Sequence, residues 1–136
     1  MQNHFFAVLV VLPALANLAA CAEKPVVHSL ELKDESGTLV AALAVALPSP
    51  LPPSSQQFEG SWQLKSHTSA FPIGSVQVGK YRGSQSDGQL LLDLNPGWAD
   101  NNVVLEVPAP MKQLQGRWCL ATFAGCHPRG TFGPAR

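Results

Sequence analysis

Apolar and polar residues alternate over several short segments after residue 25, and this period of two is typical of β-strands with one buried face. In the clearest segment, residues 58–65, Trp62 and Leu64 share one face while the polar Gln63 and Lys65 share the other. No long segment shows the period of an amphipathic helix. The alternation predicts strands at residues 26–33, 58–65, 73–81, 90–94, 103–107, 114–123 and 131–135.

One apolar run, residues 39–47, fits two kinds of secondary structure. Its alanines favour a helix, whereas its nine-residue length and the flanking Gly37 and Pro48 favour a buried strand. Residues 48–57 follow as a loop, because proline lacks the backbone N–H that a central strand needs. Residues 86–88 (Ser-Asp-Gly) have the composition of a hairpin turn. We therefore predict an all-β fold, a small antiparallel meander of about eight strands that forms a barrel or a sandwich.

Residues 57–80 align with residues 113–136 without a gap, which indicates a two-fold internal repeat. Two halves that cannot each cover their own apolar face would close on one another. The repeat units would span roughly residues 36–82 and 87–136, with one core tryptophan in each. The alternative is that two unrelated strand–turn–strand units have the same residue types at their turns and strand ends. The identical pairs are Gln57/Gln113, Gly60/Gly116, Trp62/Trp118, Leu64/Leu120, Pro72/Pro128 and Gly74/Gly130.

Each half contains a Gly-x-Trp pattern, at Gly60-x-Trp62 and at Gly116-x-Trp118. The pattern resembles the G-x-W motif in the first strand of lipocalin-like small barrels. This resemblance covers only these short segments and implies the architecture alone, so no ligand is carried over from that family. In such a barrel each glycine would leave room for the large ring two residues later.

The N-terminal residues form a separate segment, in which residues 5–16 are almost entirely apolar. This stretch is shorter than a membrane span of about 20 residues and fits the apolar region of a signal peptide. It leads into Leu18-Ala19-Ala20-Cys21, which resembles the lipobox of bacterial lipoproteins. The alternatives are an ordinary secretory signal cut after Ala22, an uncleaved anchor and a buried core helix.

The lipoprotein resemblance implies that residues 1–20 are a cleaved signal peptide and that Cys21 carries a lipid as the first mature residue. Residues 21–25 would be the tether, and residues 26–136 would be the single β domain. The membrane would then be a partner of the protein, because two or three acyl chains hold a protein firmly in a bilayer. Ala22 stands where an Asp would signal retention in the inner membrane. The resemblance therefore implies an outer-membrane anchor in a bacterial cell envelope, facing the periplasm or the cell surface.

The composition narrows the class of protein further. Nine Lys and Arg residues balance nine Asp and Glu residues, so we expect neither nucleic acid as a partner nor a polybasic membrane contact. Hydrophobic residues make up 46% of the chain and charged residues 13%, which argues against a disordered tail. A length of 136 residues is typical of one domain.

Two cysteines remain after Cys21, and an even pair outside the cytosol predicts a disulfide between Cys119 and Cys126. The alternative, a metal site formed by both cysteines and His127, lacks a fourth ligand at a recognisable spacing. The sequence contains no nucleophile elbow, phosphate-binding loop or dinucleotide fingerprint. We therefore predict no enzyme activity, no cofactor and no metal.

Three residues are candidates for binding. Trp98 lies in a polar loop, where it would stack on a sugar, anchor a protein partner, or fold back over one end of the barrel. Tyr81 and Arg117 are expected at a barrel rim. We predict a lipid-anchored, non-enzymatic binding module whose partner is an envelope protein, a glycan or a small apolar ligand. The alternatives are a periplasmic inhibitor of a lysozyme or protease, and a secreted barrel that binds a small ligand.

Overall fold

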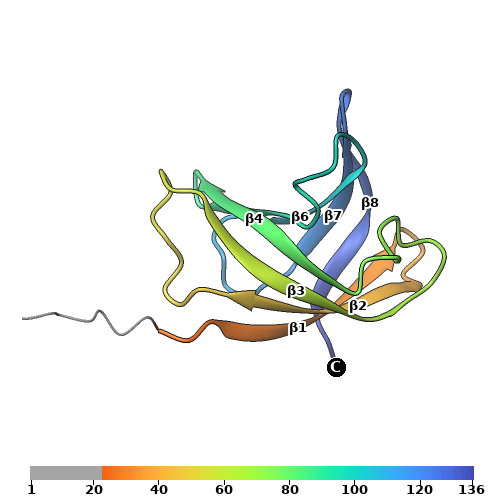
Figure 1. The fold of residues 1–136 in the computed structure, drawn as a ribbon, viewed down its shortest axis with the longest axis horizontal. Helices are drawn as coiled ribbons and strands as arrows, with labels where there is room; N and C mark the ends of the chain where they lie inside the picture. Colours follow the sequence, from red (N-terminus) through yellow and green to blue (C-terminus); the bar gives the residue numbers. More distant parts are fainter. Residues whose placement is uncertain (1–22) are drawn as a thin grey trace, which may run out of the picture.

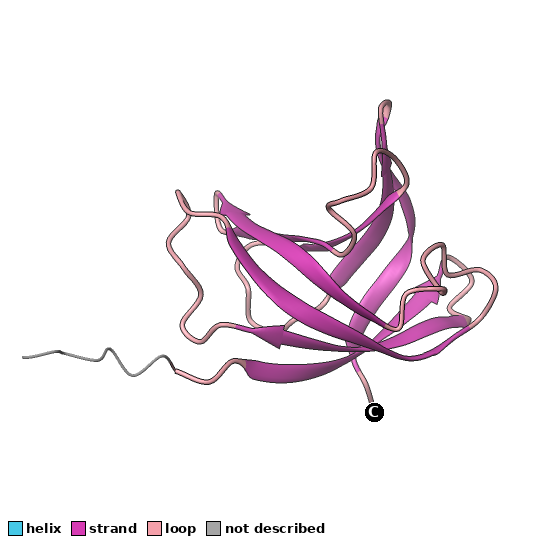
Figure 2. Ribbon diagram, in the orientation of Figure 1, coloured by secondary structure: helices cyan, strands magenta, loops and turns pink. Residues whose placement is uncertain are grey.

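The computed structural model describes residues 23–136, which form eight antiparallel strands and no helix (Figure 1, Figure 2). Each strand pairs with the next along the chain, and β1 also pairs with β8, so the sheet closes. The predicted all-β meander is confirmed, and it is a barrel and not a sandwich. The strands are β1 (Val26–Asp34), β2 (Leu39–Leu47), β3 (Phe58–His67), β4 (Val78–Ser86), β5 (Gln89–Asp93), β6 (Asn102–Val107), β7 (Gly116–Thr122) and β8 (Gly125–Pro134).

The ambiguous run at residues 39–47 is strand β2, which lies between β1 and β3. Its larger side chains, among them Leu43 and Val45, are buried inside the barrel. Ala42 and Ala44 alternate with these residues along the strand and are partly exposed on the outer wall. Because β2 has a neighbour on each side, its backbone groups are satisfied in the sheet, and this pairing overrides the preference of alanine for a helix.

Three strand boundaries differ from the prediction by more than two residues, and one of them is the end of β4, which lies at Ser86 and not at residue 81. Residues 73–77 were expected to open a strand, but they belong to the β3–β4 connection, and β4 starts at Val78. Ile73 is completely buried in that connection, so its apolar character reflects a loop that folds over the core. Strand β8 starts earlier than expected, at Gly125, because its pairing with β7 continues to the tip of the hairpin.

Aromatic side chains and glycines face each other across β3 and β4 inside the barrel. The register places Trp62 opposite Gly79 and Tyr81 opposite Gly60. A Cβ atom on Gly79 would lie 2.5 Å from the indole of Trp62, and one on Gly60 would lie 2.2 Å from the hydroxyl of Tyr81. The glycines therefore make room for large rings in a barrel whose interior is only wide enough for side chains.

The same arrangement occurs across β7 and β8, where Trp118 faces Gly130 and Phe132 faces another glycine. The predicted internal similarity is thus visible in the two hairpins. The gapless alignment is nevertheless wrong beyond β3 and β7. It matched Gly130 with Gly74, which lies in the β3–β4 connection, whereas Gly79 is the counterpart of Gly130 in the sheet. The longer β3–β4 connection accounts for this shift.

The proposed repeat units, residues 36–82 and 87–136, do not correspond as wholes. The first unit contains β2, β3 and part of β4, whereas the second contains β5 to β8. The sheet instead divides into two four-stranded halves, β1–β4 and β5–β8, and the similarity is clearest in the β3–β4 and β7–β8 hairpins, which lie on opposite sides of the closed sheet.

Both tryptophans also form hydrogen bonds that reach beyond their own hairpins. The indole Nε1 of Trp62 donates to the carbonyl of Leu94 at 2.8 Å, and that of Trp118 donates to the carbonyl of Lys33 at 2.9 Å. Each buried indole N–H thus has a partner, as a buried donor requires. These bonds tie the two rings to other strands of the barrel.

The barrel has two ends, which differ in the segments that meet there. The β7–β8 hairpin projects beyond the remainder of the barrel at one of them (Figure 1). We name this the hairpin end, and it comprises the connections at residues 35–38, 68–77, 94–101 and 123–124. The opposite, N-terminal end comprises the start of β1, the connections at residues 48–57, 87–88 and 108–115, and the C-terminal residues.

Candidate functional site

Side chains fill the interior of the barrel. The inward-facing residues of the strands form one buried cluster, as expected for a barrel of eight strands. The depressions found on residues 23–136 are open at the surface. The connections and the outer wall are therefore the places where a ligand or partner could bind. The buried cluster includes Leu30, Leu43, Val45, Trp62, Tyr81, Leu92, Leu105, Trp118 and Phe132.

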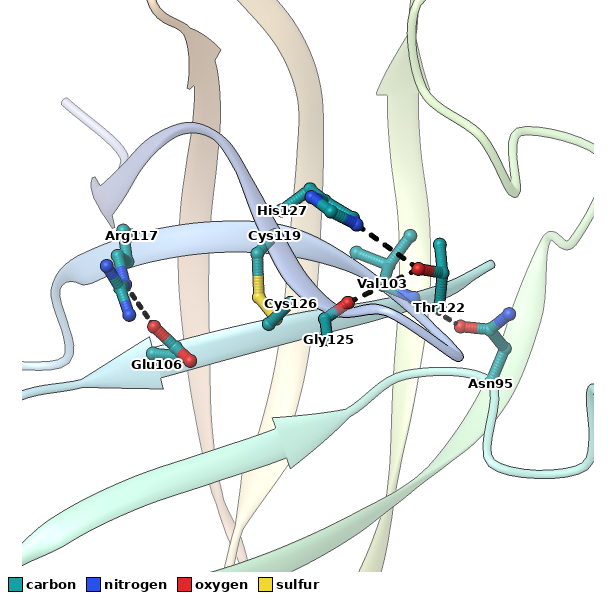
Figure 3. Close-up of a disulfide and its surroundings, with 9 residues drawn as sticks. All are labelled: Asn95, Val103, Glu106, Arg117, Cys119, Thr122, Gly125, Cys126 and His127. Carbon is teal, nitrogen blue, oxygen red and sulfur yellow. Dashed lines mark hydrogen bonds and ion pairs between the residues drawn. A yellow bond between two sulfur atoms is a disulfide. The ribbon is translucent and has the colours of Figure 1, made fainter. Parts of the chain in front are cut away.

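A disulfide joins Cys119 of β7 to Cys126 of β8, as the sequence predicted (Figure 3). The two Cα atoms lie 5.6 Å apart, a usual separation for a disulfide. The carboxylate of Glu106 lies close to both sulfurs. Because each sulfur is bonded to the other, neither can act as a thiolate ligand in this form, so the disulfide and the alternative metal site with His127 exclude each other.

The disulfide braces a hairpin whose tip is formed by Phe123 and Ala124. The backbone N–H of Ala124 donates to the hydroxyl oxygen of Thr122 at 3.2 Å, and the Nε2 atom of His127 lies 3.2 Å from the same oxygen (Figure 3). Gly125 closes the turn with a φ of 112°, a conformation that favours glycine. A covalent bond and side-chain hydrogen bonds therefore hold the hairpin in one shape.

Phe123 is 94% exposed, more than any other large apolar residue that the structure describes. The surrounding residues 120–125 carry no charge. Exposed aromatic residues on rigid elements are typical anchors of protein interfaces. Phe123 is therefore the functional candidate that the sequence analysis missed. Its sequence signal was an aromatic residue between two cysteines that pair with each other.

Trp98 lies at the same end of the barrel, in the β5–β6 connection, and is 46% exposed. Its backbone N–H donates to the carbonyl of the buried Asn95 at 3.0 Å. The Oδ1 atom of Asn95 accepts a bond from the N–H of Val103 at 2.7 Å (Figure 3). Asn102, the first residue after this connection, pairs with Ala121 of β7, so the Trp98 loop adjoins the projecting hairpin.

The β3–β4 connection completes the hairpin end. Phe71 and Ile73 are buried against the core, and the backbone N–H of Gly74 donates to the carbonyl of Phe71 at 3.2 Å. The N–H of Val76 likewise donates to the carbonyl of Ile73 at 3.0 Å. These local turns let the connection fold over the barrel and cover its interior.

Two of the predicted binding residues, Tyr81 and Arg117, do not lie at a rim of the barrel. Tyr81 is not at a rim, because the alternation of β4 points it into the barrel opposite Gly60. Its hydroxyl donates to the carbonyl of Ala46 at 2.6 Å, and burial raises the pKa of the phenol to about 12. Arg117 lies on the outer wall of β7 and forms an ion pair with Glu106 of the neighbouring strand (Figure 3).

In comparisons with known proteins, no family model, curated protein or solved structure matches the chain. Cys21 and the predicted signal peptide lie outside the described residues. Within residues 23–136, no helix is long and apolar enough to cross a bilayer. The features that bear on function are therefore the hairpin end of the barrel and the N-terminal sequence.

Proposed function

We propose that this protein is a lipid-anchored component of the bacterial cell envelope that binds a partner protein and catalyses no reaction. A lipid on Cys21 would hold the N-terminal end of the barrel at the outer membrane. The binding role rests on one observation, the exposed Phe123 at the tip of a disulfide-braced hairpin at the opposite end. Trp98 on the adjoining loop supplies a second aromatic contact.

The hairpin is well suited to binding because little order has to be created when a partner arrives. Its backbone is already paired, and the disulfide restricts it further. A rigid element loses less conformational entropy on association than a flexible loop does. The uncharged residues 120–125 also leave no charge to be stripped of water in the interface.

Two ionisable groups of the described residues have shifted pKa values, and each shift has a cause in the fold. The hydroxyl of Ser36 donates to the carboxylate of Asp34 at 2.6 Å, and the N–H of Thr38 donates at 2.9 Å. These bonds lower the pKa of Asp34 and belong to the β1–β2 turn. The raised pKa of Tyr81 arises from burial in the core.

The second candidate function is inhibition of a periplasmic hydrolase such as a lysozyme or a protease. A narrow hairpin that projects from a rigid barrel could enter the cleft of an enzyme. In this case Phe123 would occupy the cleft and Trp98 would contact its border. The third reading, a barrel that binds a small ligand inside, gains no support from an interior filled with side chains.

The intact mass of protein extracted from bacterial membranes tests the anchor. We expect a species that begins at Cys21 with added acyl mass and that gains the mass of two hydrogen atoms when its disulfide is reduced. An unlipidated species that begins at Glu23 would contradict the anchor and leave a secreted domain.

Photo-crosslinking in envelope extracts tests the hairpin. A photoreactive amino acid replaces Phe123, and a matched control replaces Val78, an apolar residue that is 67% exposed on the barrel wall. We expect one discrete protein adduct from position 123 that excess unlabelled protein suppresses and excess Phe123→Ala protein does not. The same adducts from both positions, or none from position 123, would contradict the proposal. Assays against lysozymes and proteases then separate inhibition from simple binding.

A further inference from the structure

An apolar depression lies at the N-terminal end of the barrel, opposite the projecting hairpin. It has a volume of about 340 Å³ and is formed by the start of β1, the end of β2, and the β2–β3 and β6–β7 connections. Met111 in this depression is 39% exposed. The apolar side chains that line it are Val26, Leu47, Leu51, Met111 and Leu114.

A second depression extends this surface along the edge of β1. Strand β1 pairs with β8 from Leu30 onward, and the N–H of Ala135 donates to the carbonyl of Ser29 at 2.9 Å, so only residues 26–28 of β1 have no partner on that side. The second depression, of about 500 Å³, lies there and shares His28, Gln113 and Leu114 with the first. We call the combined region the N-terminal apolar surface and define it by Val26, Val27, Leu51, Met111 and Leu114.

The predicted anchor lies within a short reach of this surface. Cys21 precedes Val26 by five residues. A fully extended chain spans at most about 3.6 Å per residue, so this tether reaches no farther than about 18 Å. A lipid on Cys21 would therefore hold this end of the barrel against the bilayer, with Phe123 at the far end.

We propose that the N-terminal apolar surface rests on the lipid leaflet that holds the anchor, an inference that depends on the proposed lipidation of Cys21. Val26, Leu51 and Met111 contact the boundary between head groups and acyl chains. The contact is shallow, because the unpaired backbone edge of β1 needs water or head groups as hydrogen-bond partners. The leaflet then sets the orientation of the barrel and directs the hairpin away from the membrane.

The charges at this end indicate that the contact is apolar and not electrostatic. Lys24 and Lys112 are matched by Glu23 and Asp87, and Arg136 lines a separate depression that also contains Glu31. A surface without net charge gains little from anionic lipids, whose attraction acts on clusters of Lys and Arg. We therefore expect the contact to depend weakly on salt and on the fraction of anionic lipid.

Fluorescence quenching in vesicles tests the contact with the acylated protein. An environment-sensitive amino acid replaces Met111, and matched controls replace Leu39, which is 42% exposed at the hairpin end of β2, and Phe123 at the hairpin tip. Each protein is reconstituted into vesicles of phosphatidylethanolamine and phosphatidylglycerol that contain a quencher on the acyl chains. We expect severalfold stronger quenching at position 111 than at either control, unchanged by added salt.

A second variant tests the apolar surface itself. Leu51→Asp in the protein that carries the reporter at position 111 should reduce the quenching severalfold. Leu39→Asp, the matched control at the hairpin end, should leave it unchanged. The near-ultraviolet circular dichroism of both variants checks that the barrel is intact.

Three results would overturn the proposal. The first is equal quenching at all three positions, and the second is no quenching at position 111 of acylated protein. The third is energy transfer between reporters at position 111 that persists when the protein is diluted in the bilayer, which would assign the surface to a second copy of the chain. A mass spectrum without acyl mass would refute the anchor and this inference together. Because the mass is measured before reconstitution, the two failures are distinguishable.

Discussion

The β3–β4 and β7–β8 hairpins pack into the core in the same way, but one has a long, buried connection and the other a short, exposed turn. In each, a buried tryptophan faces a glycine and donates its indole N–H to a carbonyl elsewhere in the barrel. The β3–β4 connection runs through residues 68–77 and returns Phe71 and Ile73 to the core. The β7–β8 turn contains only residues 123–124, and it leaves Phe123 in solvent.

The difference shows that the length of a connection determines whether its apolar residues are buried or exposed. The longer connection can fold back across the end of the barrel and bury its side chains. The short turn has no such reach, so the hairpin projects and lacks packing at its tip. A hairpin without packing is marginally stable, and here the Cys119–Cys126 disulfide supplies the constraint that the longer connection obtains from the core.

The largest expected effect comes from Ile73, the buried residue of the longer connection. Ile73→Ala should lower the free energy of unfolding by about 2–5 kcal/mol, because it removes buried methyl groups and leaves a cavity. Phe123→Ala, its counterpart in the short turn, should change that free energy by less than about 0.5 kcal/mol. Urea unfolding followed by tryptophan fluorescence measures both. A similar loss in the two variants would show that Phe123 is also packed.

The disulfide should have the next largest effect. Replacing both Cys119 and Cys126 by Ser should lower the free energy of unfolding by about 2–3 kcal/mol in the chain-entropy model for a loop of this length. Amide hydrogen exchange should accelerate at residues 120–125, while the β3–β4 connection retains its protection. Reduction of the wild-type protein provides the control. Unchanged exchange at the tip would show that pairing alone holds the hairpin.

The smallest effect concerns Tyr81, whose counterpart in β8 is Phe132, since both face a glycine one strand away. Burial raises the pKa of Tyr81 to about 12 from the ordinary value of 10.0. The unfolded chain therefore loses its phenolic proton at lower pH than the folded protein does. The contribution of the neutral phenol to stability is complete below pH 10 and is lost as the pH rises towards 12.

Tyr81→Phe provides the control for this pH dependence. The variant leaves the carbonyl of Ala46 without its hydroxyl partner, so at neutral pH it should be less stable by about 1 kcal/mol. Between pH 10 and 12 its stability should fall less steeply than that of the wild type. Tyr81 is the sole tyrosine of the chain, so phenolate absorbance reports this one group. Equal slopes in the two proteins would contradict a buried, neutral phenol.

Local patterns predicted the strands well wherever one face is buried and the other is solvated. Residues 58–65 and 103–107 alternate clearly, and both lie in strands. The run at residues 39–47 could not be decided, because alanine on the outer wall and larger residues inside form one continuous apolar segment. Residues 73–77 were misassigned, because a loop that folds onto the core shows the same apolar residues as a strand.

The candidate site was less predictable than the fold. The disulfide followed from the count of cysteines and the expected compartment. The exposure of Phe123 could not be predicted in this way. It depends on the β7–β8 turn being only two residues long and projecting from the barrel. Tyr81 was expected at a rim, and only the register of β4 against β3 places it inside.

By itself, the sequence determined the all-β class, most of the strands, the disulfide and the two core tryptophans. These features depend on alternation along a strand and on the spacing of a few residues, both of which are local. Only the tertiary structure decided that the sheet closes and which apolar residues remain outside. Closure requires pairing between β1 and β8, at opposite ends of the described chain, and no local pattern encodes that contact.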